Sequence, residues 1–349
     1  MNITGFGKAL QIKGPTLYRW YKDVLSVYAR DKTMMHKNDI THPEKGKEIE
    51  VPILKPENLG ARMSIDEKHI GDEIYTIMSN RQTGKIAMIC KSINYSEIKQ
   101  VFEKLQPALN QIQSITRDFS PLFEKVCSVL IPQAIQVGDK FHVIKNLMEA
   151  HQSVRIRYRQ KELEKRRKAH QEFKALELAR LKECERTGKT CKPDKFHYHE
   201  EKLENGETLL EILARSRYLL YKFRYQWTER QQKRALALFK KYPEIEKTYS
   251  LCNDFRILMG NNNIDQHFLH IDKQFHQWYE DVELSEIDEL QNFKSLVESN
   301  EQCIRNYFIS GETNSMAEAI NSKIQRLIAS NYGTRDPDFF FFRLSQFYA

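Results

Sequence analysis

The order of short apolar runs between residues 61 and 139 limits the fold of this chain more than any other feature. A polar turn at residues 80–84, which ends in Gly84, joins two of the runs and is typical of an antiparallel hairpin. Apolar residues at helical spacing in 96–105 and 121–130 place helices between the later runs. Five runs have the length of β-strands: residues 61–67, 74–79, 85–90, 112–116 and 134–137. The pattern predicts an α/β fold with a mixed five-stranded sheet and helices packed against it.

The segments on either side of this sheet are helical or polar. Two short helical stretches surround Lys13-Gly14-Pro15, a pattern that fits part of a helix-turn-helix or a helix packed on its neighbour. We expect five parts: a partial helix-turn-helix-like DNA-binding segment at 1–30, a linker with at most a short strand at 31–59, the first part of the core at 60–145, a large all-α insertion at 146–308, and a terminal helical segment at 309–349 that completes the core.

Composition and charge narrow the class of protein. The 349 residues carry 55 Lys and Arg against 47 Asp and Glu, so the net charge is +8 and a polyanion such as DNA is a natural partner. No apolar run approaches the ~20 residues that span a bilayer. The first ten residues lack the pattern of a signal peptide. We therefore expect a cytoplasmic, nucleoid-associated protein with no membrane partner.

The six cysteines show no regular spacing, which predicts a reducing compartment and no disulfide framework. Four potential metal ligands lie close together in one polar segment, namely Cys184, Cys191, His197 and His199. Their separations match none of the common structural zinc sites. We interpret this segment as a loop with incidental ligands.

Three carboxylates occupy positions where a nucleic-acid-processing site could form. Asp66 ends the first predicted strand, Asp118 follows the fourth, and Glu318 lies one turn into a helix predicted at 316–330. The strand order matches a ribonuclease H-like core, in which the first and fourth strands are neighbours. Cleavage of a phosphodiester by two metal ions needs oxygen ligands that converge from different elements. We therefore predict that Asp66, Asp118 and Glu318 are catalytic and bind metal.

Several stretches carry a family resemblance. Ser64 to Glu67, Asp139 to Lys145, and Thr313 to Gly333 with Glu318 and Asn321 resemble the conserved stretches of bacterial insertion-sequence transposases. The similar group is the DDE type, with a long helical insertion before the catalytic Glu, and the likeness extends over residues 15–344. The resemblance implies a DDE triad, two Mg²⁺ or Mn²⁺ ions, and strand cleavage and transfer at terminal inverted repeats.

The identity of the second aspartate has two interpretations. Asp118 has the expected topological position, whereas Asp139 belongs to an Asp-Lys-Phe-His stretch after the fifth strand that resembles a near-site motif of related transposases. We take Asp118 as the metal ligand and place Asp139 and His142 beside the site. Glu67 is either part of the site or a neighbouring surface acid.

The partners that this resemblance implies are double-stranded DNA, as element ends and as target, and a second protomer in a homodimer or larger assembly. Relatives usually begin with a zinc-binding module that is absent here, so a separate module or a truncated copy is implied. A non-catalytic or truncated transposase-derived DNA-binding protein is the alternative function. Trp278 is expected in the core, and the Phe339 to Phe342 run is expected to pack against the sheet. The candidate DNA-binding residues are Arg19, Lys22, Lys140, Lys145, Trp227, Asn321, Lys323 and Arg335.

Overall fold

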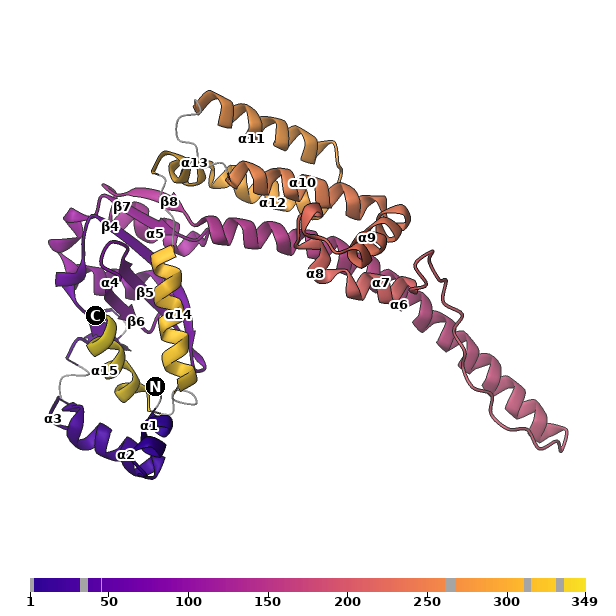
Figure 1. Cartoon of the computed structure of the whole chain (residues 1–349), viewed down its shortest axis with the longest axis horizontal. Coiled ribbons are helices and arrows are strands. Elements are labelled where there is room, and N and C mark those ends of the chain that lie inside the picture. The colour runs from indigo at the N-terminus through magenta and orange to yellow at the C-terminus, as the bar shows by residue number, and fades with distance from the viewer. Residues whose placement is uncertain (1–2, 32–36, 45, 261–267, 311–314, 331–335) are drawn as a thin grey trace. The chain divides into compact units, whose positions relative to one another are not determined.

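A computed structural model describes residues 3–31, 37–44, 46–260, 268–310, 315–330 and 336–349. The chain divides into two compact units (Figure 1). Unit 1 comprises Met1–His142 and Asn300–Ala349, and unit 2 comprises Val143–Ser299. Among the described helices, none is long and apolar enough to cross a membrane.

A six-stranded mixed sheet forms the centre of unit 1, in the order β3-β6-β5-β4-β7-β8. β4 pairs antiparallel with β5 and β5 with β6, while β4, β7 and β8 run parallel. The bounds are β3 (Ile53–Leu54), β4 (Arg62–Ile70), β5 (Glu73–Asn80), β6 (Ile86–Cys90), β7 (Ser114–Arg117) and β8 (Ile135–Gly138). The mixed α/β fold and the strand order predicted from the sequence are confirmed.

The expected count of five strands was one too few, because the predicted linker contributes an edge strand. Ile53 and Leu54 of β3 pair with Ile89 and Met88 of β6, and both apolar strands gain hydrogen bonds and burial. The same segment also forms a small hairpin from β1 (Ile40–Thr41) and β2 (Glu48–Ile49). At the opposite edge, α13 (Glu301–Ser310) covers β8, and the Asn306 side chain donates to the Gln136 carbonyl at 2.7 Å.

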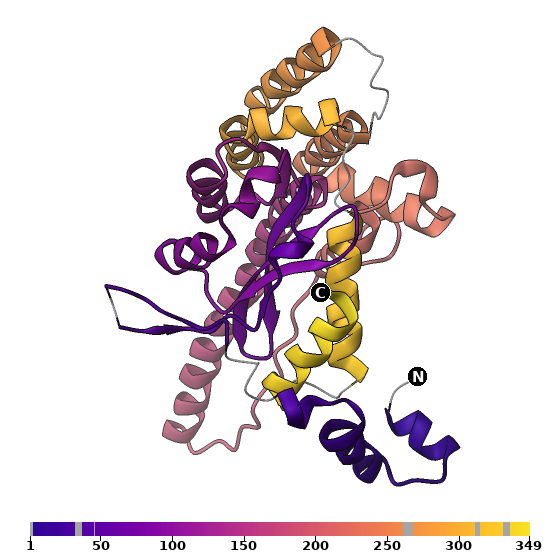
Figure 2. The same cartoon turned by 90° about the vertical axis from the view of Figure 1, so that its left-hand side faces the viewer.

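Helices cover both faces of the sheet and give unit 1 three layers (Figure 2). α4 (Tyr95–Leu105) and α5 (Pro121–Leu130) pack on one face, where they share a core with Met63 and Ile65 of β4. α14 (Ser315–Ser330) and α15 (Pro337–Tyr348) pack on the other face, where Ile320, Ile324 and Leu327 meet β5 and β6. Because side chains alternate along a strand, the even-numbered positions 64 and 66 of β4 face α14.

The four consecutive phenylalanines of α15 serve two surfaces, so the expectation that the run packs against the sheet holds for half of it. Phe340 and Phe341 contact the sheet, with the rings of Phe341 and Tyr75 5.1 Å apart. Phe339 and Phe342 lie three residues apart and therefore share another helix face, where they pack on Tyr28. Tyr18 and Tyr21 join this cluster, which therefore anchors α2 (Gly14–Trp20), the π-helical segment η1 (Tyr21–Leu25) and α3 (Tyr28–Asp31). The first helix, α1 (Ile3–Ala9), packs on α2.

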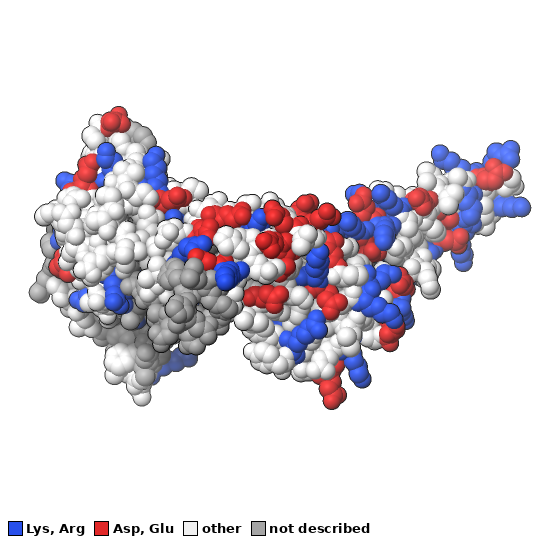
Figure 3. All heavy atoms as spheres, turned by 90° about the horizontal axis from the view of Figure 1, so that it is seen from above, with Lys and Arg blue, Asp and Glu red and all other residues white. Residues whose placement is uncertain are grey.

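Unit 2 is mainly helical in its described residues, with a non-helical segment between α6 and α7. Trp278 is buried, as expected, and its indole N–H donates to the Leu251 carbonyl at 2.9 Å. On α6, Lys and Arg are interspersed with Glu, and Figure 3 shows the two charges intermixed over this helix. The bounds are α6 (Lys140–Arg186), α7 (Leu209–Arg215), α8 (Arg217–Leu220), α9 (Glu229–Lys241), α10 (Pro243–Gly260), α11 (Phe268–Glu283) and α12 (Asp288–Ser299), with α6 starting in unit 1.

One disulfide corrects the expectation that the cysteines stay unpaired. Cys184 and Cys191 are bonded, with their Cα atoms 6.1 Å apart. Irregular spacing in sequence hid the pair, because α6 ends between the two residues and Gly188, at φ +69°, reverses the chain. The returning segment is also held by Arg180, whose guanidinium donates to the Lys192 carbonyl at 2.7 Å. The bond occupies the two thiols that a zinc site in this segment would need.

A buried histidine is an electrostatic weak point of unit 2. His151 of α6 is fully buried, and neither ring nitrogen has a hydrogen-bond partner within the described part of the chain. Burial, with smaller contributions from Arg155 and Arg256, lowers the pKa of His151 to about 3. The folded state therefore holds this ring neutral, and an unfolded chain takes up a proton below about pH 6.5.

We predict that His151→Leu stabilises unit 2 and that its advantage grows as the pH falls. A buried polar atom without a partner costs about 1–3 kcal/mol, which the substitution removes. Between pH 7.5 and 5.5 the stability difference from wild type should widen by about 1.4 kcal/mol, because only the wild type must keep a neutral histidine. Thermal melts at the two pH values measure this. His151→Gln, which is polar but does not titrate, should show the pH effect without the full gain. Parallel pH profiles for wild type and His151→Gln would refute the assignment.

Candidate active site

The parallel strands place three aspartates in one row. Ser64 of β4 pairs with Thr116 of β7, and Thr116 pairs with Val137 of β8. Two residues further along each strand lie Asp66, Asp118 and Asp139. Neighbouring strands are ~4.8 Å apart, so Asp118 lies one strand from Asp66, whereas Asp139 lies two strands, or roughly 9.6 Å, away.

Asp66 differs from its predicted place because its strand does not stop there. β4 continues to Ile70, since the antiparallel hairpin with β5 extends beyond the short neighbour β7. Asp66 therefore lies two residues beyond Ser64, the last residue of β4 that pairs with β7. No residue of β7 pairs with Asp66. Asp118 follows the last residue of β7, as predicted, and its Oδ1 accepts from the Ser120 backbone N–H at 2.9 Å.

Helix α14 connects Glu318 to this row. Glu318 is exposed in the first turn of α14, and Asn321 follows three residues later, on the same side of the helix. The Asn321 amide donates to Asp66 Oδ2 at 2.7 Å, while the Glu67 backbone N–H donates to Asp66 Oδ1 at 2.9 Å. Asn321 thus fixes the helix that carries Glu318 against the strand that carries Asp66. Asn321 stays a predicted DNA contact, and its spacing from Glu318 is the sequence signal for this additional role.

Asp139 accepts a backbone hydrogen bond of the kind that Asp118 also accepts, and in addition it contacts the His142 side chain. It precedes α6, and its Oδ1 accepts from the Phe141 backbone N–H at 2.9 Å, which is the bond of a helix N-cap. Its Oδ2 lies 2.9 Å from His142 Nδ1. Both carboxylate oxygens are therefore engaged by the start of α6, which agrees with a place beside the site for Asp139 and His142.

Arg117 is a residue that the sequence analysis missed. It is buried at the end of β7, where its Nε donates to Gln136 Oε1 at 2.7 Å and its Nη1 to the Asp118 carbonyl at 2.8 Å. The guanidinium holds the backbone of the segment that presents Asp118. A basic residue next to a strand-ending acid was the available signal.

The carboxylates act on one another electrostatically. Burial raises the pKa of Asp66 most, the Asn321 hydrogen bond and His142 oppose this rise, and Asp118 adds to it. Burial also raises the pKa of Glu318, with a further increase from Asp139 and a decrease from His142. The hydrogen bond with Asp139 raises the pKa of His142, and Asp66 and Asp118 contribute in the same direction. Negative charge is therefore in excess here, and a cation would be stabilised.

The donors fit a hard divalent cation by chemical type, since Mg²⁺ and Mn²⁺ prefer carboxylate oxygens. Among the described residues, no group of three His, Cys, Asp or Glu side chains is close enough to hold one ion. The structure thus provides two aspartates on adjacent strands and a helix with Glu318 that is tied to one of them. The Glu318 side chain is exposed.

The candidate DNA-binding residues lie in varied surroundings. Lys22 forms an ion pair with Asp336 and lies over the Tyr28 ring, so its charge serves the N-terminal cluster, whereas Arg19 is exposed. Lys140 lies 5.4 Å from the centre of the Tyr307 ring. Lys323 lies 5.1 Å from that of Tyr348.

The other candidates also differ from one another. Lys145 is exposed and 3.9 Å from Glu149. Trp227 is half-buried, and its indole N–H donates to the Leu219 carbonyl at 3.0 Å. Arg335 lies outside the described residues. Among the described candidates, Asn321 is the one that donates a hydrogen bond to a predicted catalytic carboxylate, Asp66.

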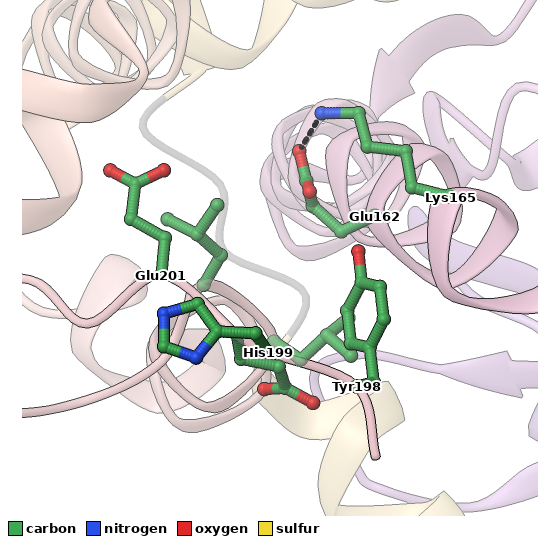
Figure 4. Close-up of a pocket in the computed structure, with 8 residues that line it drawn as sticks. Glu162, Lys165, Tyr198, His199 and Glu201 are labelled. Carbon is green, nitrogen blue, oxygen red and sulfur yellow. Dashed lines mark hydrogen bonds and ion pairs between the residues drawn. The ribbon is translucent and has the colours of Figure 1, made fainter. Parts of the chain in front are cut away.

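A separate hollow in unit 2 is unsuited to a DNA backbone. Its volume is about 200 Å³, and Glu162, Glu200 and Glu201 line it together with Tyr198 and His199 (Figure 4). The one lysine of the lining, Lys165, donates to Glu162 at 2.8 Å. An acidic lining repels phosphate, so we do not assign this hollow to the candidate active site.

The comparisons with known proteins identify the family of this chain. A protein-family model described as "Transposase", of the DDE type and the ISL3 group, matches residues 63–344. This chain is a member of that transposase family. The match begins in β4 and ends in α15, so it includes both units of the transposase. Searches of curated proteins and of solved structures find no significant match.

We predict that Asp139→Asn lowers the pKa of His142, because the substitution removes the carboxylate that stabilises the imidazolium. Nitrogen-15 histidine spectra over a pH titration measure this. In the wild type the folded pKa is raised, so the pair contributes its full stability below about pH 6.5 and loses it as the pH rises through the folded value. The other histidines should titrate as before and serve as internal controls. An unchanged His142 titration would contradict the assigned pair.

Proposed function

We propose that this transposase cleaves DNA strands at the ends of an insertion sequence and joins them to target DNA, in a reaction that depends on divalent metal. Asp66, Asp118 and Glu318 would hold two Mg²⁺ or Mn²⁺ ions. The observation that carries the proposal is that Asp66 and Asp118 each lie two residues beyond the last paired position of neighbouring parallel strands, while Asn321 ties the Glu318 helix to Asp66.

The metal ions, when bound, would activate the attacking oxygen and stabilise the leaving oxygen of the scissile phosphodiester. The task of the chain's own residues is to bind and orient. Asp66 and Asp118 supply oxygen donors from the rigid sheet, and Glu318 supplies one from a helix. Asn321 keeps Asp66 in one rotamer, and the Arg117 guanidinium holds the segment with Asp118 in place.

Two features support Asp118 rather than Asp139 as the second metal ligand. Asp118 is one strand from Asp66, a separation that side chains can bridge to ions ~3.5–4 Å apart. Asp139 is two strands away, and both its oxygens already cap α6 and bind His142. We propose that Asp139 and His142 stay beside the site, where a protonated His142 would face the phosphate.

The first prediction concerns Glu318→Gln, which should lower metal-dependent nicking of a labelled duplex by about a thousandfold. The duplex should carry the DNA that flanks the coding region, where the element's ends lie. A metal ligand supplies several kcal/mol to the transition state, and ~1.4 kcal/mol corresponds to tenfold in rate.

The matched control is Glu67→Gln, the same change at an exposed acid next to Asp66, which should nick like the wild type. DNA binding without nicking by the wild type and by both variants would favour the alternative function, a non-catalytic DNA-binding protein. Equal loss in Glu67→Gln and Glu318→Gln would contradict the assignment of the site.

A second prediction separates positioning from catalysis. Asn321→Ala should lower nicking about 10–100-fold, as removal of a partner of a metal ligand typically does. Excess Mn²⁺ should restore part of the loss, because Asp66 is still present. The activity of Asn321→Ala and of Asp66→Asn over a range of Mn²⁺ concentrations measures this. Failure of Mn²⁺ to rescue Asn321→Ala any better than Asp66→Asn would show that Asn321 does not act through Asp66.

A further inference from the structure

An aromatic and basic segment of unit 2 has no part in the carboxylate site. Between Glu211 and Glu229 the chain contains no acidic residue. Over the same stretch it carries five aromatic residues and four basic ones, and the two kinds alternate: Arg215, Arg217, Tyr218, Tyr221, Lys222, Phe223, Arg224, Tyr225 and Trp227. The segment begins in α7, runs through α8 and the 3₁₀ turn η5 (Arg224–Gln226), and ends before α9.

Two rings of this segment are stacked at the surface. The Phe223 and Tyr225 ring centroids are 5.6 Å apart, and their planes differ by 8°. Tyr225 is 81% exposed, an unusual degree for so large a ring. The Arg256 guanidinium of α10 lies 4.0 Å from the centre of the Phe223 ring. We call Phe223, Tyr225 and Arg256 the stacking platform.

The platform is held rigidly by its neighbours. The Gln226 side chain accepts from the Phe223 backbone N–H at 3.0 Å, and the Trp227 indole donates to the Leu219 carbonyl at 3.0 Å. The Trp227 ring packs 5.3 Å from that of Tyr249, so this tryptophan anchors the turn from inside. The Asn253 side chain accepts from Arg256 at 2.9 Å. An exposed ring on an ordered turn loses little entropy on binding a flat partner.

Charge near the platform favours an anionic partner. Arg215 and Arg224 have carboxylate partners in Glu207 and Glu246. Arg217 and Lys222 form no ion pair with any described residue, so their charge is available to a phosphate. A second exposed ring, Tyr218, lies beside Arg217, with the guanidinium 5.5 Å from its centre. Aromatic faces interleaved with cations match the two parts of an unpaired nucleotide, the base and its phosphate.

We propose that the stacking platform binds unpaired bases of single-stranded DNA, with Tyr225 stacking on a base and Arg217 or Lys222 meeting the backbone. The choice of DNA rests on the proposed function, which makes DNA the transposase's substrate. The partner is the single-stranded form, because a base inside a duplex does not present its face to a ring. Trp227, which the sequence predicts only as a DNA-binding residue, lies outside the platform, and its ring packs inward on Tyr249.

The test uses the full chain without added metal and a fluorescein-labelled oligo(dT) of 15 nucleotides, with a blunt duplex of the same length as reference. Tyr225→Ala should weaken single-strand binding about tenfold or more, and duplex binding should not change. Tyr225→Phe keeps the ring and should bind like the wild type. Leu236→Ala, an exposed apolar residue of α9 outside the platform, should also bind like the wild type. Quenching of 2-aminopurine placed within the strand should be lost in Tyr225→Ala alone, as expected for stacking.

Three results would overturn the proposal. The first is a single-strand affinity of Tyr225→Ala equal to the wild type. The second is an equal loss toward single strand and duplex in a variant whose circular dichroism and melting are unchanged. The third is unchanged binding together with loss of a dimer in light scattering, which would make the platform a protein interface. Because no metal and no cleavage enter the assay, a failure of the platform leaves the carboxylate site untouched. Retained nicking in Glu318→Gln, which would contradict the carboxylate site, likewise leaves the platform untouched.

Discussion

The parallel pairing of β4 with β7 is the constraint on which the candidate site depends. It places Asp66 and Asp118 two residues beyond the last paired positions of neighbouring strands, where two like charges would repel each other at close range. A protein gains nothing in stability from such a pair, and burial makes the charged form of Asp66 costlier still. The Asn321 amide and the His142 ring both lower the pKa of Asp66 and so offset part of this cost. Two neighbouring acids that cost stability are expected where function requires them.

The three-layer packing of unit 1 brings α14, the helix that carries Glu318, to the face of the sheet on which Asp66 lies. The face of the sheet that lacks α4 and α5 receives α14, whose apolar residues Ile320 and Ile324 pack on β5 and β6. The same packing brings Asn321, on the polar side of α14, within hydrogen-bond distance of Asp66. The packing of the hydrophobic core therefore positions the helix that carries Glu318, although Glu318 is far from both aspartates in sequence. α15 completes this layer, because it packs on the sheet with α14 and also contacts the N-terminal helices.

Much of this arrangement could be predicted from the sequence, because strand lengths, helix periodicity and acids at strand ends are local patterns. The five strands from 61 to 138 and the helix with Glu318 were of that kind. What could not be predicted depends on contacts between distant segments. β3 becomes a strand only because β6 offers it hydrogen bonds, and Asn321 contacts Asp66 only because α14 lies on that face of the sheet. The Cys184–Cys191 bond depends on a chain reversal at Gly188. The run from Phe339 to Phe342 contacts a second surface besides the sheet only because the N-terminal helices lie beside α15.

The central claim is that Asp66 and Asp118, rather than Asp66 and Asp139, form the metal-binding pair. Electron paramagnetic resonance of Mn²⁺ added to the full chain tests this directly, by counting bound ions in the wild type, Asp118→Asn and Asp139→Asn. The account predicts bound Mn²⁺ in the wild type, a large loss of binding in Asp118→Asn, and binding close to the wild type in Asp139→Asn. Retained binding in Asp118→Asn together with its loss in Asp139→Asn would contradict the account and would assign the second ligand to β8.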